Sequence, residues 1–517
     1  MSILGPSEGF FQVARPHNDS GSGERIKMMN DEKKALAARF FHPKSIAVIG
    51  VSADENAFGT RYLTGLLNFG YKGKLYPVNP RGGSLFGLTV YPGVGDIPDI
   101  VDLAVVSVPG RAVPGILESC LMKGIKATIV LSAGFSETGE EGKKLEGEIN
   151  RIIPKGIRVI GPNCFGIYCP RGGLTVLPGK DFPKETGPVG LVAQSGQFTE
   201  MIVLASRGLG VRFSEAISYG NACDLNETDF IELLADDPET KVIACYIEGV
   251  KDGRRFLEVV RKALKVKPVL IWKAGLTSTG RKAATSHTGS LAGSEAVWNT
   301  FFAQSGAIRV DTMDDLIDST TACLHLLPRG GRRVALLSGS GGSAVIGADV
   351  FEGSGLQLPP FSAEVQQKIS SYLPSIITGV RNPVDLGDPI PPAEKLAPIL
   401  EAIAGGEQVD TIVVGRMFLS VKGPSLVGGF PKSFEQGREG LREVPVMVKE
   451  KYGKPMVVVL SEETSDAGPI EMEFEADRRN LRDYYLANGI PVYPTLNRAA
   501  KAIINVARYK ERFHQQG

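Results

Sequence analysis

A short apolar stretch decides the fold: SIAVIG, residues 45–50. It carries no charge, is rich in β-branched residues and ends in glycine. A continuous apolar run of this length is typical of a parallel strand that is buried on both faces. The terminal glycine permits a tight turn out of the strand. The stretch therefore predicts a buried first strand followed by a turn at Gly50.

The same pattern recurs outward from this strand. Four comparable runs follow it: KLYPVNP (74–80), DLAVVSVP (102–109), KATIVLSAG (126–134) and RVIGPNC (158–164). Helical stretches such as VPGILESCLMKG lie between them. Strands that alternate with helices imply right-handed crossovers and a parallel sheet covered on both faces. We therefore expect a Rossmann-like domain over residues 36–170, preceded by a mobile arm (1–35) that ends in a short helix.

Two further series of strands indicate two more α/β domains. The second series is VGLVAQSG (189–196), RFSEAISYGN (212–221), KVIACYIEG (241–249) and PVLIWKAG (268–275), and the third is VALLSGSGG (334–342), TIVVG (411–415), PMVVVLS (455–461) and IPVYP (490–494). Segments rich in Pro and Gly separate the series. We expect flavodoxin-like domains over residues 185–328 and 332–517.

Composition excludes several classes of function. Lys and Arg number 58 against 57 Asp and Glu, a net charge of +1, which argues against nucleic-acid binding. No apolar stretch approaches the roughly 18 residues of a membrane span. The six cysteines form no C-x-x-C pair, and no secretory leader is evident. These features favour a cytoplasmic protein with reduced thiols.

The turn after the first strand favours a phosphorylated ligand. In VIGVSADENAFG (48–59), Gly50 is followed by Val and Ser52, so the second glycine of a dinucleotide-binding motif is missing. The second strand ends at Asn79 and Arg81 rather than at an acidic residue that would hold a ribose. This pattern favours a nucleotide such as coenzyme A (CoA) over NAD. The alternative is a glycine needed only for close packing of helix on strand.

Two loops have the character of phosphate sites. AQSGQF (193–198) places Ser195 and Gly196 between a strand and a helix, where free N–H groups and the helix dipole attract anions. SYGNACD is a second such loop, with Gly220 and Asn221 after a strand. Asn163 in GPNCFG can bond a ligand or simply its own turn.

His287 is the candidate nucleophile. It lies in KAATSHTGSLAG (282–293), where its small neighbours let a bulky group approach the ring. A neutral imidazole accepts a phosphoryl group near pH 7, and a carboxylate can orient it. Glu248 ends a strand, where it could do this. A satisfied, non-catalytic histidine is the alternative, and it is the expectation for the other four histidines: His17, His42, His325 and His514.

Taken together, these segments resemble the α subunit of ADP-forming acetyl-CoA synthetase and, more distantly, that of succinyl-CoA synthetase. The likeness runs from about Phe41 to Arg512. The segments that carry it are HPKSIAVIGVS, YPVNPRGG, VDLAVVSVPG, SAGFSETGEEG, GPNCFGIYCP, AQSGQF, SYGNACDLNETDF, DDPETKVIACYIEGVKDGRRF, KAATSHTGSLAGSEAVW and NPVDLGD.

The resemblance implies a CoA-binding domain followed by two ligase domains. It implies that acid, CoA and ATP give acyl-CoA, ADP and phosphate through an acyl phosphate and a phosphohistidine. His287 matches the phosphorylated histidine and Glu248 the glutamate that orients it. The loops at Ser195-Gly196 and Gly220-Asn221 match those holding the phosphate. The positions implied for CoA binding are Gly50, Ser52, Asn79, Arg81, Pro109 and Asn163.

The resemblance also implies a partner. The family needs an ATP-grasp unit for the nucleotide and Mg²⁺, and no segment here resembles one. We therefore expect a separate ATP-grasp β subunit, an αβ hetero-oligomer, no metal site on this chain, and a small carboxylic acid or acyl-CoA as substrate.

Three departures from the family pattern bear on specificity. The family often has SQSGA where this chain has AQSGQ, which puts Gln197 near the phosphate loop. The segment 418–453 is longer than expected, and 461–480 is unusual. They point away from assuming acetate as the acid.

A second hypothesis belongs to another class: a CoA-responsive regulatory protein without turnover. The intact SHTGSLAG segment and Glu248 argue against it. An NAD-dependent dehydrogenase is disfavoured by the glycine spacing and the missing acidic ribose ligand.

Overall fold

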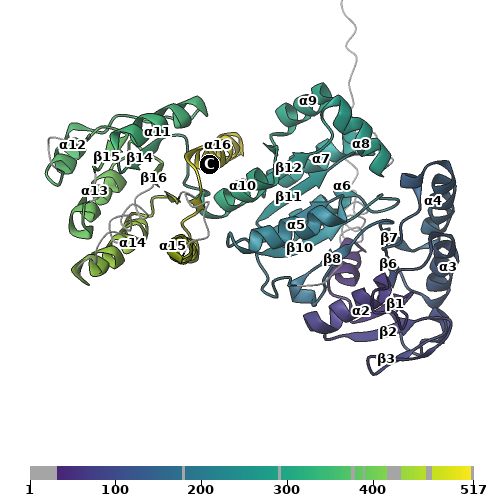
Figure 1. Ribbon diagram of the computed structural model, residues 1–517. Helices are drawn as coiled ribbons and strands as arrows, with labels where there is room; N and C mark the ends of the chain where they lie inside the picture. The colour runs from purple at the N-terminus through teal and green to yellow at the C-terminus, as the bar shows by residue number, and fades with distance from the viewer. Residues whose placement is uncertain are drawn as a thin grey trace, which may run out of the picture.

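The chain is built around three parallel sheets that follow one another in sequence (Figure 1). The computed structural model describes residues 32–176, 181–288, 293–373, 379–387, 391–415, 432–460 and 469–513, without the side chains of 284–288, 432–441 and 469–474. The first sheet lies at the lower right of the view, the middle sheet in the centre and the C-terminal sheet on the left. The predicted α/β class with parallel sheets is confirmed.

The first sheet has the strand order β2-β1-β5-β6-β7. Its strands are β1 (Ser45–Ile49), β2 (Lys74–Val78), β5 (Leu103–Val106), β6 (Ala127–Val130) and β7 (Arg158–Ile160). Its helices are α2 (Phe58–Phe69), α3 (Val113–Lys123) and α4 (Glu140–Ile152), and the expected helix before the first strand covers residues 32–41. A hairpin of β3 (Gly83–Leu85) and β4 (Leu88–Val90) stands apart.

The middle sheet has the order β13-β12-β11-β9-β10-β8. Its strands are β8 (Gly166–Tyr168), β9 (Val189–Ala193), β10 (Phe213–Ser218), β11 (Val242–Ile247), β12 (Val269–Lys273) and β13 (Ile308–Val310). Its helices are α5 (Gly196–Arg207), α6 (Glu227–Asp236), α7 (Gly253–Leu264), α8 (Ser278–Thr288), α9 (Glu295–Ser305) and α10 (Met313–Leu326).

The C-terminal sheet has the order β15-β14-β16-β17-β18. Its strands are β14 (Val334–Ser338), β15 (Val384–Asp385), β16 (Thr411–Gly415), β17 (Met456–Val459) and β18 (Val492–Tyr493). Its helices are α11 (Gly341–Gly353), α12 (Ala363–Ser370), α13 (Ala393–Gly405), α14 (Lys432–Tyr452), α15 (Pro469–Ala487) and α16 (Leu496–Phe513).

All three sheets share one topology. When the parallel strands of each sheet are numbered along the chain, their spatial order is 2-1-3-4-5 every time. This doubly wound order reverses direction between its first and third strands. Ligands of such folds bind outside the carboxyl ends of these two strands. The chain therefore contains three equivalent crevices, and their loops decide what each can do.

Every strand predicted from an apolar run is present, but five short strands were not predicted: β3, β4, β8, β13 and β15. The strand β8 lies within the predicted first domain, residues 36–170, but joins the middle sheet. It pairs antiparallel with β10 of the middle sheet, with Tyr168 opposite Ala216. Three residues are too few for a periodic signal, so only the pairing reveals the strand.

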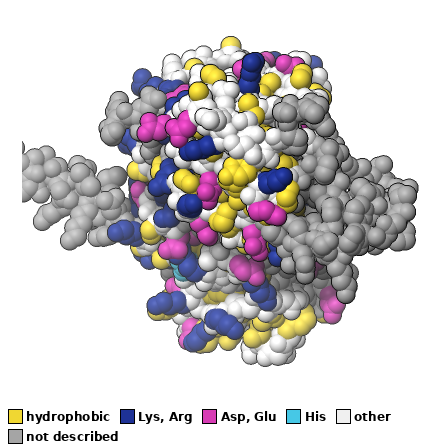
Figure 2. All heavy atoms as spheres, turned by 90° about the vertical axis from the view of Figure 1, so that its left-hand side faces the viewer, with side chains coloured by type: hydrophobic (Ala, Val, Ile, Leu, Met, Phe, Trp, Pro, Cys, Tyr) yellow, Lys and Arg dark blue, Asp and Glu magenta, His cyan; other side chains and the backbone are white. Residues whose placement is uncertain are grey.

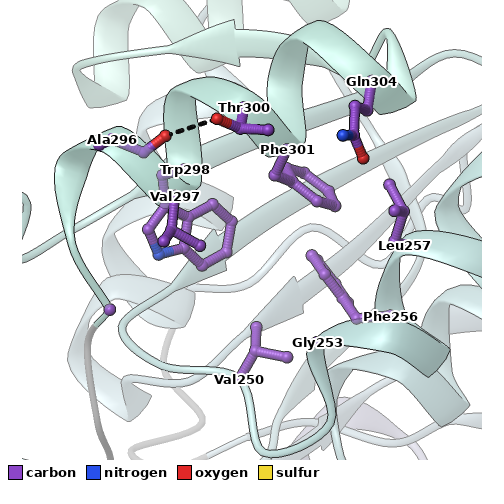
Figure 3. A pocket seen from close by; sticks show the side chains of 11 residues that line it. Val250, Gly253, Phe256, Leu257, Ala296, Val297, Trp298, Thr300, Phe301 and Gln304 are labelled. Atoms are coloured by element: carbon purple, nitrogen blue, oxygen red, sulfur yellow. Dashed lines mark hydrogen bonds between the residues drawn. The ribbon is translucent and has the colours of Figure 1, made fainter.

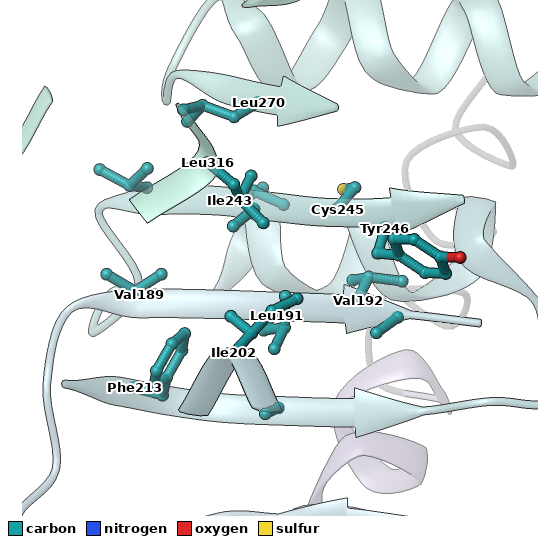
Figure 4. Close-up of a cluster of buried hydrophobic side chains, with 14 of the residues drawn as sticks. Val189, Leu191, Val192, Ile202, Phe213, Ile243, Cys245, Tyr246, Leu270 and Leu316 are labelled. Atoms are coloured by element: carbon teal, nitrogen blue, oxygen red, sulfur yellow. The ribbon is translucent and has the colours of Figure 1, made fainter. Parts of the chain in front are cut away.

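The predicted burial on both faces is seen in β1. Ile46 and Val48 belong to a large hydrophobic cluster, whereas Ala47 and Ile49 belong to a second one with helices α3 and α4. Successive side chains of a strand point to opposite faces, so two layers need an uninterrupted apolar run. The large cluster continues through the middle sheet, where Figure 4 shows apolar side chains from neighbouring strands meeting between the layers.

Helix α16 joins the C-terminal sheet to the middle domain by packing on α10 (Figure 1). Arg498 of α16 donates from Nε and Nη2 to the two carboxylate oxygens of Asp318, at 2.5 and 2.9 Å. Lys501 pairs with Asp315 of α10 at 2.5 Å. A bidentate pair of this kind fixes orientation as well as distance. Helix α16 therefore holds the middle and C-terminal sheets together.

The unusual C-terminal segments are described only in part. Residues 418–431 and 461–468 lie outside the described residues, and α14 and α15 follow them. On the face seen in Figure 2, charges of both signs are interspersed with hydrophobic side chains. No helix in the part of the chain that the structure describes has the length and hydrophobicity of a membrane span.

Candidate active site

A cavity of about 510 Å³ opens where loops of the first and middle sheets meet. On one side it is lined by the turns after β1 and β5, and on the other by the loops after β9 and β10. Of the predicted site residues, the following line it: Gly50, Pro109, Asn163, Ser195, Gly196, Gly220 and Asn221. Two crevices from separate sheets thus contribute to one cavity.

Position 50 requires glycine because neighbouring backbone approaches it too closely for a side chain. Its φ is +95°, and a Cβ there would lie 2.0 Å from the carbonyl oxygen of Ser107. A Cβ at Gly59 would lie 2.5 Å from the carbonyl oxygen of Gly50. The glycine thus serves close packing, the alternative considered above, and also forms part of the cavity wall.

Ser52, Asn79 and Arg81 lie near this turn but not on the cavity wall. The side-chain nitrogen of Asn79 donates to the carbonyl of Val51 at 2.6 Å. The backbone N–H of Arg81 donates to the Asn79 side-chain oxygen at 2.9 Å. Asn79 therefore holds the turns after β1 and β2 together, and Arg81 is exposed.

Ser195 caps α5 at the cavity. Its hydroxyl accepts from the N–H of Phe198 at 3.4 Å. Gly196 follows as the first helical residue, and a Cβ there would come within 2.5 Å of the Phe165 ring. The remaining N–H groups of this first turn carry the positive end of the helix dipole. The cavity therefore contains an anion-binding element.

The Gly220-Asn221 loop forms the seam between the two domains. Gly220 has φ +58°, and a Cβ there would lie 2.2 Å from the carbonyl oxygen of Pro162. The side-chain nitrogen of Asn221 donates to Glu137 at 2.6 Å, and its oxygen accepts from Asn163 at 3.4 Å. Both atoms of the Asn221 amide are thus engaged within the protein.

Glu248 follows β11 and lies at the crevice of the middle sheet. Tyr246 donates its hydroxyl to Glu248 Oε1 at 3.2 Å. The Gln194 side-chain oxygen accepts from the N–H groups of Glu248 and Gly249 at 2.9 and 3.1 Å. Because β9 and β11 are neighbours, Gln194 after one strand reaches the loop after the other. The carboxylate is buried and held on both its main chain and its side chain.

A buried lysine completes this arrangement. Lys273 at the end of β12 donates to the carbonyl oxygens of Glu248, at 2.8 Å, and of Ala274. Its ammonium also lies 5.1 Å from the centre of the Trp298 ring, a cation–π contact. Burial lowers the pKa of Lys273 to about 8, although the Glu248 carboxylate opposes the shift. A positive charge therefore sits behind Glu248.

His287 is part of α8. Its side chain lies outside the described residues, as do residues 289–292. Glu248 does not line the 510 Å³ cavity. The pairing of Glu248 with His287 therefore stays a prediction from the sequence.

Sequence reasoning missed two residues of this site, Gln194 and Lys273. Gln194 stands directly before Ser195 in the quoted AQSGQF segment. Lys273 ends an otherwise apolar strand, PVLIWK, and an unbroken run that ends in a buried charge is the signal that could have revealed it. Both side chains form hydrogen bonds with the main chain of Glu248. The spacing of these residues in the sequence does not reveal these contacts.

A second cavity of about 470 Å³ lies between α7 and α9 (Figure 3). Phe256 of α7 stacks on Phe301 of α9 with ring centres 5.0 Å apart, and Trp298 lies beside them. None of the predicted site residues lines it, and its lining contains no ionisable side chain. The aromatic side chains around this cavity hold Trp298 against Lys273.

The cysteines are not candidates for nucleophilic catalysis. All six are free thiols. Cys164 lines the 510 Å³ cavity, but burial raises the pKa of its thiol to about 12. A thiol must ionise to attack, so the buried Cys164 has the character of a structural cysteine.

Two family models match parts of the chain. Residues 44–170 match the family model described as CoA binding domain. Residues 186–323 match the model described as succinyl-CoA ligase like flavodoxin domain. The cavity thus lies between a CoA-binding domain and a ligase domain.

Relatives cover nearly the whole chain. The α subunit of ADP-forming acetate–CoA ligase I from Pyrococcus furiosus is 36% identical over 480 residues, which are 90% of this chain and 95% of that protein. The ADP-forming 4-hydroxybutyrate–CoA ligase of Nitrosopumilus maritimus is 35% identical over 86% of this chain and 62% of its own length. The dinucleotide forming acetyl-coenzyme A synthetase 1 of Ca. Korarchaeum cryptofilum, solved with phosphate and ADP, superposes with a TM-score of 0.79. It is 30% identical and covers 93% of this chain and 99% of its own.

The fold and the cavity define a CoA-dependent ligase of the succinyl-CoA ligase type. Within that class, the chain belongs to the family of ADP-forming acetate–CoA ligase α subunits. The relatives described above join a carboxylic acid to CoA, and no comparison supports a regulatory protein without turnover.

Proposed function

We propose that this chain is the α subunit of an ADP-forming acyl-CoA synthetase that works through a phosphohistidine at His287. The reaction is ATP + carboxylic acid + CoA ⇌ ADP + phosphate + acyl-CoA. The observation that carries the proposal is the shared cavity, where turns of the CoA-binding domain face the capped N-terminus of α5. A thiol ester and a phosphate can meet there.

In the direction of acyl-CoA breakdown, phosphate attacks the acyl carbon and CoA leaves as the thiol. A ring nitrogen of His287 then attacks the phosphorus of the acyl phosphate, and the carboxylate leaves. A terminal oxygen of ADP takes the phosphoryl group from the ring and restores the neutral imidazole. The chain's part is to bind CoA, hold phosphate and carry the phosphoryl group.

Each site residue receives a role in this scheme. The first-turn N–H groups of α5, after Ser195, stabilise the phosphate charge. Glu248 accepts the proton on the other nitrogen of His287 and so fixes the tautomer. Lys273 fixes the main chain of Glu248 and supplies a buried positive charge near the phosphorylated ring. The turns at Gly50 and Pro109 hold CoA.

The partner is proposed to be an ATP-grasp β subunit that binds the nucleotide and Mg²⁺. The Pyrococcus furiosus relative is named a subunit α, and the Nitrosopumilus maritimus ligase is longer than the part that this chain matches. We propose a cytoplasmic αβ assembly, in which the six thiols stay reduced. Gln197 lines the cavity, so acetate is not assumed to be the acid.

The test is to map phosphate on this chain after incubation with its β subunit, Mg²⁺ and ATP, and in a second reaction with acyl-CoA and phosphate alone. An acid-labile phosphate on His287 is expected, and His287→Ala should abolish both the phosphate and turnover. His325→Asn is the matched control and should keep both. A His287→Ala chain with full turnover would rule the relay out.

A further inference from the structure

Three metal-binding side chains meet at the outer edge of the middle sheet. One ligand atom each from His42, Cys169 and Glu215 lies within 4.8 Å of the others. His42 follows the helix over residues 32–41, Cys169 follows β8, and Glu215 belongs to β10. None of the three lines either cavity described above. From the sequence, no catalytic role is predicted for His42 and no metal site is predicted on this chain.

The cluster is buried and incompletely bonded. Cys169 is 0% exposed and Glu215 is 2% exposed. Glu215 Oε2 has no hydrogen-bond partner among the described residues. Leaving a buried carboxylate oxygen without a donor costs free energy, so such an atom calls for an explanation. A cation bound to it provides one.

The neighbouring groups hold the three ligands in place. The Cys169 sulfur lies 4.0 Å from Glu215 Oε1. The imidazole of His42 rests against the turn that follows Cys169, since a Cβ on Gly172 would lie 3.3 Å from His42 Nδ1.

Two cations lie close to the cluster: Arg171, and Lys267, whose ammonium interacts with Glu215 and Asp237. The Arg171 guanidinium lies 3.5 Å from Glu215, 3.9 Å from Asp237 and 3.8 Å from Glu239. Two positive side chains, Arg171 and Lys267, and three negative ones leave a formal charge of −1, so the surroundings favour a cation. Arg171 contacts only Oε1 of Glu215, so it does not satisfy Oε2. Its side chain is 39% exposed, and it can keep Asp237 and Glu239 when Glu215 turns to a metal.

We propose that His42, Cys169 and Glu215 bind one zinc-class divalent cation. Sulfur, imidazole nitrogen and carboxylate oxygen are the ligand types of tetrahedral zinc, and a water would take the fourth position on the exposed His42 side. On binding, the Cys169 thiol gives up its proton to solvent and its sulfur bonds the metal. One proton is released per cation.

The metal would fasten the two halves of the active cavity to each other. His42 stands directly before the first sheet, whereas Cys169 and Glu215 belong to the edge of the middle sheet. A bond network through the cation therefore ties the CoA-binding domain to the ligase domain at a point away from the cavity. Binding to the folded state alone raises thermal stability in proportion to occupancy.

The experiment uses the full chain, stripped of metal with a chelator and titrated with Co²⁺ as a spectroscopic probe and with Zn²⁺. One equivalent of Co²⁺ should give the thiolate-to-cobalt charge-transfer absorption. Zn²⁺ should displace Co²⁺, release one proton and raise Tm. His42→Asn and Cys169→Ser should each weaken binding at least tenfold, and Cys169→Ser should remove the charge-transfer band. Cys120→Ala, another fully buried thiol, is the matched control and should change neither.

Absence of the charge-transfer band from the native chain would overturn the site. So would Zn²⁺ affinity that His42→Asn leaves unchanged. His42 is exposed, so His42→Asn tests the metal site even if Cys169→Ser does not fold. The readouts are independent of turnover, so they stand whether or not the phosphohistidine relay is correct.

Discussion

The middle and C-terminal sheets share a topology but differ in the residues at their crevices. Both have the 2-1-3-4-5 order, and in both the first helix starts at a capping serine. Ser195 accepts from Phe198 at 3.4 Å, and Ser340 from Ser343 at 3.3 Å. The third strand is followed by Glu248 in the middle sheet, whereas it ends at Gly415 in the C-terminal sheet.

The fourth strands differ in the same sense. In the middle sheet this strand ends at Lys273, whose ammonium holds the Glu248 carbonyl. In the C-terminal sheet it ends at Val459, and the buried Leu460 follows. The fold thus supplies a position beside a helix N-terminus in both sheets. Among the described residues at these strand ends, the middle sheet alone has a carboxylate and an ammonium, which supports the proposal that phosphoryl chemistry takes place there.

The largest expected effect comes from removing the carboxylate. Glu248→Gln keeps the size of the side chain but cannot accept a proton from an imidazolium or fix its tautomer. We expect the rate of His287 phosphorylation to fall by roughly 10²–10³-fold. Quench-flow phosphorylation with labelled ATP and the β subunit measures it. An unchanged rate would mean that the Glu248 carboxylate does not distinguish the middle crevice from the C-terminal one.

The next effect comes from the ammonium. Lys273→Met should lower phosphorylation by about tenfold, the effect of roughly 1.4 kcal/mol. In the wild-type chain the rate should fall as pH rises through about 8, where Lys273 loses its proton, and the methionine variant should lack this step.

The free energy of unfolding should change with pH in the direction opposite to the phosphorylation rate. Between pH 8 and the ordinary lysine value of 10.5, the unfolded chain binds a proton at Lys273 that the folded chain has lost. Its contribution to the free energy of unfolding therefore rises with pH in that window. Denaturant titrations of the wild-type chain and of Lys273→Met should show this rise only in the wild-type chain. The same pH profile in the wild type and in Lys273→Met would contradict the role of Lys273 in the site.

A smaller effect is expected on acyl specificity. Gln197 is exposed, lines the cavity and makes no side-chain hydrogen bond to a described residue, so its amide is available to a substrate. Gln197→Ala should lower kcat/KM for a hydroxy acid relative to its unsubstituted analogue by about 2–10-fold. Steady-state assays with 4-hydroxybutyrate and butyrate measure the ratio. A ratio that does not move would place the acyl group away from Gln197.

The smallest effect compares the two helix caps. Ser195→Ala and Ser340→Ala should each cost about 1 kcal/mol of stability, since the same hydrogen bond is lost. Only Ser195→Ala is expected to weaken protection of the chain by inorganic phosphate in a thermal-shift titration. Equal loss of protection in both variants would place α11 at a phosphate site as well.

The sequence alone predicted the three α/β units, because uninterrupted apolar runs can be buried only in parallel sheets covered on both faces. It predicted the loops at Gly50, Ser195 and Gly220 for a similar reason. Glycine and capping residues at strand ends have a local meaning that needs no tertiary contact. The short strands β3, β8 and β15 escaped prediction because two or three residues carry no period.

The tertiary structure decided which of these local features work together. Strand order brings Gln194, Glu248 and Lys273 to one crevice from three separate strand ends, and no spacing in the sequence encodes that meeting. Docking of two domains, held by Asn221 on Glu137, turns two crevices into one cavity. Patterns of burial are local and can be read along the chain, whereas contacts between strand ends depend on the order of strands in space.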